Sequence, residues 1–375
     1  MKNIAIIGGG AAGLFAAVTL LKAGQQVTVY ERNDRLGRKL SQTGNGQGNV
    51  TNANMGARYY FSDAPERVQT VLSRFTERDL IAFLEEMGGL FLPDARGRVY
   101  PAGRQASAVT DLFRREVASL GGKVKLNEFV REISFRKKFL LTASAREEYD
   151  CVLLAAGGMA QKNFGTDGNG YALARMFGHS VIAPSPALVP VKCEGTKSLR
   201  GLRVDGELTL TRGEKEIVRV RGDVLFTDFG ISGDAAFYLS SYVREGDCFT
   251  LDFLPDVSKE RLCSAVKEGE DGLLCIVNNA VARAVYKRAG GERNKLVSLL
   301  KSYPMPVFGT LGFDRAQVTK GGIPLSEVSD NMESKLRSGL YFAGEILNAD
   351  GVCGGYNLQW AFSSAHAAAE GMLCD

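Results

Sequence analysis

Histidine is almost absent from this 375-residue sequence, which contains only His179 and His366. Two isolated histidines, without an H-E-x-x-H pattern or paired cysteines, argue against a zinc or di-iron centre. The absence of a G-x-S-x-G elbow argues against a Ser-His-Asp hydrolase. The cysteines form no C-x-x-C pair, so we interpret them as free thiols. They are Cys151, Cys193, Cys248, Cys263, Cys275, Cys353 and Cys374.

Long apolar runs and blocks of one charge are also missing. The longest apolar helix expected near the N-terminus, residues 11–21, is too short to span a bilayer, and it lacks the charged leader of a signal peptide. The net charge is only +4, and the basic residues are spread along the chain. We therefore expect a cytoplasmic protein with a small-molecule substrate and no membrane or nucleic-acid partner. The oligomeric state is left open.

Glycine, in contrast, is abundant, with 44 residues, and its first cluster is the most informative. An apolar strand over residues 4–7 is followed by G-x-G-x-x-G at residues 8–13, and Glu31 closes the next expected strand. This spacing is typical of a dinucleotide-binding βαβ unit, in which an acidic residue about 20 positions later binds the adenosine ribose. The candidate ligands from this segment are Gly8, Gly10, Ala11, Ala12, Gly13, Glu31 and Arg32.

Three later segments repeat the combination of glycine with a strand or a basic loop. A basic, glycine-rich loop spans residues 37–52, and an apolar strand over 149–154 ends in glycines at 157 and 158. The chain closes with a strand over 339–343, a Gly-Glu pair, and a glycine turn that opens a helix at about residue 355. The loop indicates a ligand longer than NAD, with more backbone donors around it. We expect both chain ends to build one site.

The middle of the chain has a different hydrophobic period. From about residue 187 to 253 apolar and polar residues alternate, which is typical of antiparallel strands with one solvent-exposed face. Residues 258–303 return to helical spacing. This part is predicted to be an insertion into the nucleotide domain.

Together these segments resemble the bacterial YhiN/BaiN-like FAD-dependent oxidoreductases, a family that includes aminoacetone oxidase. The resemblance covers the whole chain and implies an α/β fold: a Rossmann-like FAD-binding domain split in sequence, an inserted antiparallel β-barrel and a helical subdomain. The implied ranges are 1–186 and 326–375 for the FAD domain, 187–257 with 304–325 for the barrel, and 258–303 for the helices. The motifs that carry it are 8–13 with Glu31, 37–52, 154–158, 226–233, 318–322, 343–345 and 354–360.

The resemblance also implies a role for each part of the site. Glu31 accepts the ribose hydroxyls, Val130 lies near the adenine, and the backbone at Ala156 and Gly157 supports the dinucleotide. Glu345 bonds a ribityl hydroxyl or orients the phosphates, and the helix start at 355–358 faces the flavin pyrimidine. The pyrophosphate and flavin side is surrounded by Arg38, Lys39, Thr43, Gly44, Asn45 and Gly46. The closing segment contributes Gly344, Glu345, Gly355, Tyr356, Asn357 and Leu358.

Two departures from the family pattern limit this transfer. Many relatives have Arg-Cys where this chain has Gln47-Gly48, and His and Pro where it has Asp228 and Asp234. No role of the missing arginine or cysteine is carried over. We assign no catalytic acid or base; the candidates are Tyr100, which could protonate a carbonyl, Cys353 as a redox thiol, and Tyr356 beside the flavin.

The resemblance implies oxidation of a small amine or aminoketone such as aminoacetone, with oxygen as acceptor. An alternative is an NAD(P)H-dependent reductase of a conjugated C=C bond in a 3-oxo bile-acid or steroid-like compound. Because only one dinucleotide fingerprint is present, NAD(P)H would then bind transiently at the flavin face. A more remote alternative is a non-catalytic flavin-binding or RNA-associated protein.

Overall fold

The structure is a computed structural model that describes residues 1–267 and 269–374 and divides into two compact units. The first unit comprises residues 1–185 and 318–375, and the second comprises residues 186–317. In the described part of the chain, no helix is both long and apolar enough to cross a membrane. Each unit has its own architecture and is treated separately below.

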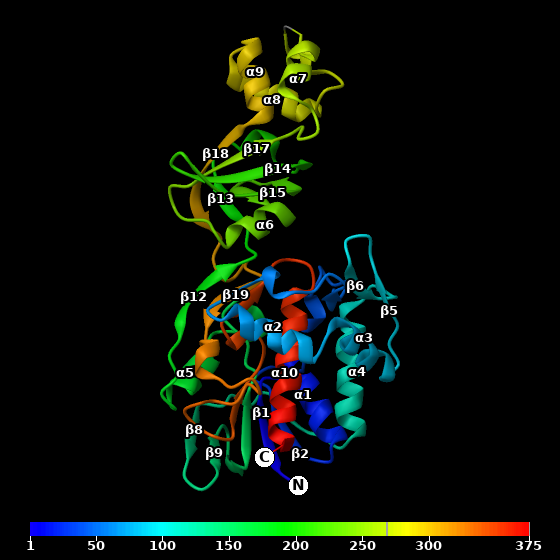
Figure 1. Cartoon of the computed structure of the whole chain (residues 1–375), viewed down its shortest axis with the longest axis vertical. Helices are drawn as coiled ribbons and strands as arrows, with labels where there is room; N and C mark the ends of the chain where they lie inside the picture. The colour runs from blue at the N-terminus through cyan, green and yellow to red at the C-terminus, as the bar shows by residue number, and fades with distance from the viewer. Residues whose placement is uncertain (268, 375) are drawn as a thin grey trace. The chain divides into compact units, whose positions relative to one another are not determined.

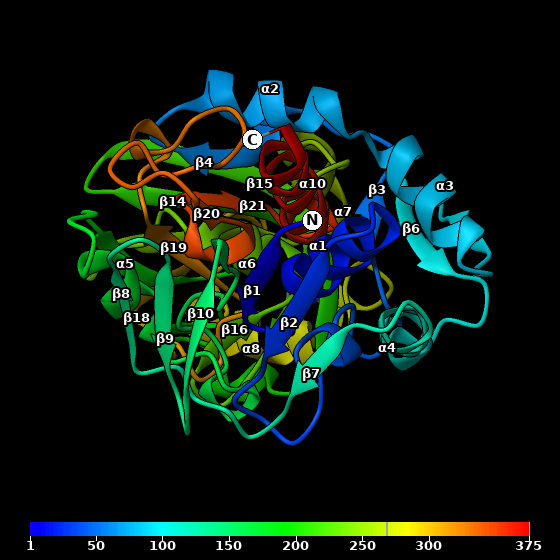
Figure 2. The same cartoon turned by 90° about the horizontal axis from the view of Figure 1, so that it is seen from below.

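The first unit is built on a parallel five-stranded sheet in the order β20-β11-β1-β2-β7. The two central strands, β1 and β11, are almost wholly apolar, as expected for a sheet covered on both faces. Figure 2 shows β1, β2 and β7 side by side. The sheet strands are β1 (Asn3–Ile7), β2 (Gln26–Tyr30), β7 (Lys123–Lys125), β11 (Cys151–Leu154) and β20 (Leu340–Phe342).

The two chain ends meet within this unit. The last helix, α10 (Tyr356–Cys374), packs along α1 (Ala11–Lys22), as Figure 1 shows in red and blue. Strand β20 pairs in parallel with β11, which itself pairs with β1. The other helices are α2 (Pro65–Arg74), α3 (Glu77–Glu86), α4 (Ala106–Ser119) and α5 (Asn169–Arg175), with short 3-10 turns that include Leu40–Gln42, Ala57–Tyr59, Leu325–Glu327 and Gly344–Ile346.

Small sheets of two or three strands complete the first unit. Residues 123–133 contribute β7 to the parallel sheet and the first residues of a separate hairpin sheet. The three-stranded sheets are β8 (Glu132–Phe135), β9 (Phe139–Thr142) and β10 (Arg146–Tyr149), and β3 (Thr51–Asn52), β6 (Arg98–Pro101) and β5 (Phe91–Pro93). The two-stranded sheets are β4 (Tyr60–Ser62) with β21 (Ala349–Gly351), and β12 (Ile182–Ala187) with β19 (Val318–Gly322).

The second unit contains a closed antiparallel barrel in the order β13-β16-β15-β14-β17-β18. Alternate residues such as Leu208, Leu210 and Phe249 point into its core, which explains the period of two in the sequence. The barrel strands are β13 (Val191–Cys193), β14 (Arg203–Arg212), β15 (Lys215–Phe226), β16 (Gly230–Ser232), β17 (Cys248–Asp252) and β18 (Tyr303–Thr310). Its helices are α6 (Asp234–Ser240), α7 (Lys259–Ala265), α8 (Asn279–Ala289) and α9 (Arg293–Lys301).

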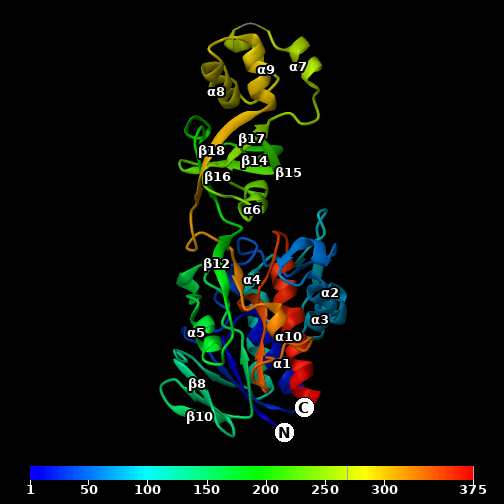
Figure 3. The same ribbon diagram turned by 60° about the vertical axis from the view of Figure 1, so that its left-hand side comes forward.

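The predicted fold class, a Rossmann-type domain with an inserted antiparallel barrel and helices, is confirmed. Figure 3 shows α7, α8 and α9 grouped together, within the range where helical spacing returned. One detail differs. Residues 318–325, expected in the barrel, lie in the first unit, because β19 pairs with β12 there.

Candidate functional site

In the glycine turn after β1, the fold requires glycine at Gly8 and Gly13 but not at Gly10. A Cβ at Gly8 would lie 2.4 Å from the Ala155 carbonyl oxygen, and a Cβ at Gly13 would lie 1.9 Å from the Gly8 oxygen. Gly10 has an ordinary extended backbone, and a Cβ there would meet nothing within 4 Å. The fold alone therefore gives no reason for glycine at position 10. The open space before the N-terminus of α1 fits the close approach of a pyrophosphate.

Glu31 follows β2 and is held beside this turn. Its Oε2 accepts a hydrogen bond from the Gly9 backbone N–H at 2.9 Å, and its Oε1 accepts two from Asn33, at 2.9 Å from the backbone and 2.7 Å from the side chain. The carboxylate is buried, with 8% of the residue exposed. Because each carboxylate oxygen has two acceptor positions and Oε1 already accepts two bonds, Oε2 retains one position for a ribose hydroxyl.

Val130, predicted near the adenine, and Arg32, predicted as a cofactor ligand, have different surroundings. Val130 is buried, and its carbonyl accepts a hydrogen bond from Asn169 at 3.2 Å. Arg32 pairs with Asp167 at 2.6 Å, and its guanidinium lies 4.7 Å from the ring centre of Phe129. The Arg32 charge is thus engaged by protein groups, and Asp167 keeps a lowered pKa despite its burial.

The basic loop after Glu31 is a tight glycine-rich turn. Gly44, Asn45 and Gly46 all have left-handed backbones, with φ of 58°, 55° and 82°. Gly48 has φ of 79°, and a Cβ there would lie 2.9 Å from Ala106 Cα at the start of α4. The cysteine of relatives could not replace Gly48 here without a shift of this contact. The Thr43 hydroxyl bonds the Leu40 carbonyl, which closes the loop's first turn.

A cluster around Glu345 connects segments that are far apart in the sequence. Lys39 Nζ lies 2.7 Å from Glu345 Oε2, and Glu345 Oε1 accepts a hydrogen bond from the Thr319 N–H at 2.9 Å. The Thr319 hydroxyl accepts hydrogen bonds from the N–H groups of Met159 and Ala160, at 2.7 and 3.0 Å. This cluster joins the basic loop, the turn after β11, β19 and the turn after β20.

Arg38, which precedes Lys39 in the basic loop, has a guanidinium N–H donor without a protein partner. Its Nη1 bonds Asn33 Oδ1 at 3.2 Å, whereas its buried Nε has no hydrogen-bond partner. An unpaired guanidinium N–H in a buried position is costly unless a ligand completes it. Arg38 therefore fits the predicted pyrophosphate contact.

The start of α10 is fixed by close backbone contacts. Gly355 has φ of 100°, and a Cβ there would lie 2.3 Å from the Thr51 carbonyl oxygen. Asn357 accepts a hydrogen bond from the Gly351 N–H at 2.8 Å and donates one to the Gly351 carbonyl at 2.7 Å. Trp360 is buried and donates to the Gly344 carbonyl at 3.2 Å, so it anchors the turn after β20 by packing. Leu358 is half-buried on the first turn.

The three catalytic candidates lie around these contacts. Tyr356 packs on Tyr59 with 4.6 Å between ring centres, and burial raises its pKa to about 12. Tyr100 is buried in β6, next to the residue that pairs with Thr51 of β3. The Cys353 thiol is close enough to Tyr100 to influence its pKa electrostatically.

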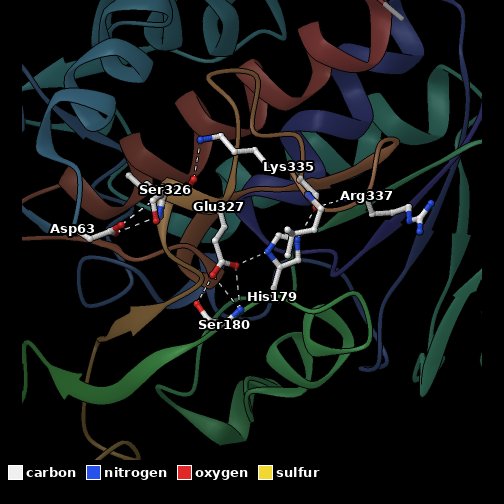
Figure 4. A network of polar contacts seen from close by, with 10 residues as sticks. Asp63, His179, Ser180, Ser326, Glu327, Lys335 and Arg337 are labelled. Atoms are coloured by element: carbon white, nitrogen blue, oxygen red, sulfur yellow. Dashed lines mark hydrogen bonds and ion pairs between the residues drawn. The ribbon is translucent and has the colours of Figure 1, made fainter.

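His179, which follows the end of α5, lies inside a polar network (Figure 4). Its Nδ1 lies 2.8 Å from Glu327 Oε2, and its Nε2 lies 2.6 Å from the Ser334 hydroxyl. The Ser180 N–H also donates to the Glu327 carboxylate, so the network fastens the segment after β19 to the end of α5. Its polar groups bond one another, and we assign it a structural role. Among the described residues, no group of histidine, cysteine and carboxylate side chains could hold a metal.

Two site residues were not predicted as such from the sequence, although Thr319 lies within the 318–322 motif. Thr319 is buried in β19, and its bonds become visible only once β19 is placed beside Glu345. Asp350 is buried in β21, and both its carboxylate oxygens lack a hydrogen-bond partner. A buried, unpaired carboxylate is identifiable only after the chain is folded.

Comparisons with known proteins agree with this architecture. The family model described as "HI0933-like protein Rossmann domain" matches residues 2–371. A 3-dehydro-bile acid delta(4,6)-reductase of Clostridium scindens is 32% identical, with 98% of each chain covered. A ribosomal RNA dihydrouridine synthase of Haemophilus influenzae is 31% identical over 98% of this chain and 97% of its own.

Solved structures share the fold at low sequence identity. A 3-ketosteroid delta1-dehydrogenase of Sterolibacterium denitrificans superposes with a TM-score of 0.56 at 13% identity, covering 100% of this chain and 99% of its own. A 3-ketosteroid-delta4-(5alpha)-dehydrogenase of Rhodococcus jostii gives 0.54 at 15% identity, with 98% and 96% covered. Taken with the family match, the site geometry leads to one conclusion: the chain belongs to the HI0933-like Rossmann family, the YhiN/BaiN-like group that the sequence motifs indicated, and is a FAD-dependent oxidoreductase.

Proposed function

We propose that this protein reduces a C=C bond that is conjugated to a carbonyl group. The observation that carries the proposal is the chemistry shared by two relatives, each more than 30% identical over 98% of the chain. Reduction of a delta-4 bond next to a 3-oxo group and formation of dihydrouridine from uridine both saturate such a bond. This supports the reductase alternative over amine oxidation.

The reaction needs a hydride at the β-carbon and a proton at the α-carbon of the unsaturated carbonyl compound. Bound FAD supplies hydride chemistry, with NAD(P)H as the expected reductant. In this chain Gly10, Glu31 and Glu345 would hold the cofactor, with Arg38 at its pyrophosphate. The first turn of α10 presents the positive end of a helix dipole, which stabilises negative charge on a group beside it.

We assign the proton donor to Tyr100. Burial raises its pKa above the ordinary value and outweighs the opposing effect of Arg98 and Arg104, so the phenol stays protonated at neutral pH. Arg104 lies 4.1 Å and Arg98 6.0 Å from the ring centre. Both cations stabilise the phenolate that remains after proton transfer, which then recovers a proton from water.

A stopped-flow experiment under anaerobic conditions tests the reaction type. The purified yellow protein is reduced with NADH or NADPH and then mixed with a 3-oxo-4,6-diene steroid, and return of flavin absorbance is followed. We expect reoxidation by the unsaturated ketone and no bleaching by aminoacetone. Bleaching by aminoacetone, together with no reoxidation by any conjugated C=C compound, would refute the proposal.

A second candidate substrate is uracil in an RNA strand. It is favoured by arginine side chains that stack on aromatic rings near α10. Arg58 lies 4.8 Å from the ring centre of Tyr59, which packs on Tyr356, and Arg104 covers Tyr100. Such planes stack bases, while the guanidinium groups meet phosphates. Reoxidation by a uridine-rich oligonucleotide, weakening steeply with salt, is expected from this form. Reoxidation by the steroid alone would exclude it.

A further inference from the structure

Asp350 is a buried carboxylate without a bonding partner. It lies in the middle of β21, with 2% of the residue exposed, and neither of its carboxylate oxygens has a hydrogen-bond partner. Burying a charged or polar group without a hydrogen bond costs stability, so native proteins rarely retain one without a purpose. The neighbouring amides do have partners, because Asn348 bonds Asp63 and Asn357 bonds Gly351. The Asp350 carboxylate is thus unpaired although the side-chain amides around it are paired.

The side chain faces charged groups from two other elements. Asp350 pairs with Phe61 of β4, and directly paired residues of antiparallel strands project on the same face. Lys320 of β19 lies 4.6 Å from the Phe61 ring centre, and it therefore approaches the face that carries Asp350. Glu345, whose carboxylate already binds Lys39, also acts on Asp350 electrostatically. Burial raises the pKa of Asp350 to about 7, against the opposing effect of Lys320.

The position of Asp350 in the chain indicates what completes it. It lies between Glu345 and the start of α10, the two elements assigned to the flavin end of the cofactor. A carboxylate with free acceptor positions is completed by a hydroxyl donor. At the flavin end of FAD, the hydroxyl groups belong to the ribityl chain.

We propose that Asp350 is a further FAD-binding residue, whose carboxylate accepts a hydrogen bond from a ribityl hydroxyl. The proposal depends on the FAD assignment and is independent of the substrate reduced. The bond favours the ionised carboxylate, so FAD binding lowers the pKa of this group. FAD should consequently bind more weakly as the pH falls through about 7, the pKa of the unliganded protein.

The test measures FAD affinity of the full-length apoprotein by quenching of flavin fluorescence. We expect Asp350→Ala to raise the Kd for FAD at least tenfold, and Asp350→Asn to abolish the pH dependence between pH 6 and 8. Asp111→Asn, at an exposed position on α4 that pairs with Arg114, should change neither quantity. An unchanged Kd in Asp350→Ala would overturn the proposal.

Two further measurements separate a binding role from a purely structural one. FAD analogues that lack single ribityl hydroxyls should bind the wild type less tightly, and one analogue should show no such penalty in Asp350→Ala. In the unliganded protein, the raised pKa of Asp350 means that its ionisation lowers the stability of the fold increasingly as the pH rises above the ordinary pKa of an aspartate. Asp350→Asn should therefore raise the apoprotein Tm more at pH 8 than at pH 5. Equal analogue penalties in wild type and variant would refute the ribityl contact even if the Tm changes as expected.

Discussion

At the scale of single residues, Gly10 and Gly13 test whether the glycine turn serves a ligand or the fold. Gly10→Val places a side chain into open space, so the apoprotein should fold normally while losing bound FAD. Gly13→Ala should instead destabilise the protein, because its Cβ would meet the Gly8 carbonyl at 1.9 Å. The ratio of flavin to protein absorbance and the thermal melt of each apoprotein check both outcomes. Normal flavin content in Gly10→Val would contradict the pyrophosphate placement.

Tyr100 carries the second prediction at this scale. Tyr100→Phe keeps the ring under Arg104 but removes the acid, so reoxidation of the reduced flavin by substrate should slow by about 10²-fold or more. Reduction of the flavin by NAD(P)H should stay unchanged, because no proton from Tyr100 enters that step. Cys353→Ala is the matched control and should alter neither rate by more than a few-fold. If Cys353→Ala slowed reoxidation and Tyr100→Phe did not, the acid would be the thiol.

At the scale of elements, the ion pair between Lys39 and Glu345 joins the basic loop to the turn after β20. Their side chains are 22% and 21% exposed, so solvent screens the pair less than an exposed one. A double-mutant cycle with Lys39→Met and Glu345→Gln, measured by urea unfolding of the apoprotein, should give a coupling energy of about 0.5–3 kcal/mol. The exposed pair of Asp111 and Arg114 on α4 should give about 0.3–0.5 kcal/mol. Equal couplings for the two pairs would mean that the cluster does not fasten these elements.

Features that depend on residues close together in the sequence could be predicted, whereas features that depend on pairing between distant segments could not. The strand–turn–helix unit at Gly8 was predictable because its apolar period, its glycines and Glu31 are all local. The β4 and β21 pairing was not, because two strands of three residues each carry almost no pattern and meet across most of the chain. Thr319 and Asp350 were missed for the same reason. Residues 318–325 were placed in the barrel by the family resemblance, and the pairing of β19 with β12 places them in the first unit instead.

At the scale of the whole molecule, a change of hydrophobic period was enough to indicate an insertion. Alternation over about 187–253 and helical spacing over 258–303 correspond to a barrel and helices with a core of their own. Every residue assigned here to the cofactor site, from Gly8 to Leu358, belongs to the first unit. Ligand binding should therefore act on the stability of one unit only.

Calorimetry of the full chain can detect this division. Two separate cores predict two unfolding transitions, and saturating FAD should move only the transition of the first unit. At a free FAD concentration of about 100 times the Kd, the gain is about 2.7 kcal/mol. Phe249→Ala removes a fully buried ring from the barrel core. It should lower the free energy of unfolding of the second unit by about 3–5 kcal/mol and leave FAD binding intact. If FAD moved both transitions equally, or if Phe249→Ala weakened FAD binding, the two units would have to unfold as one, and the cofactor site could not be assigned to the first unit alone.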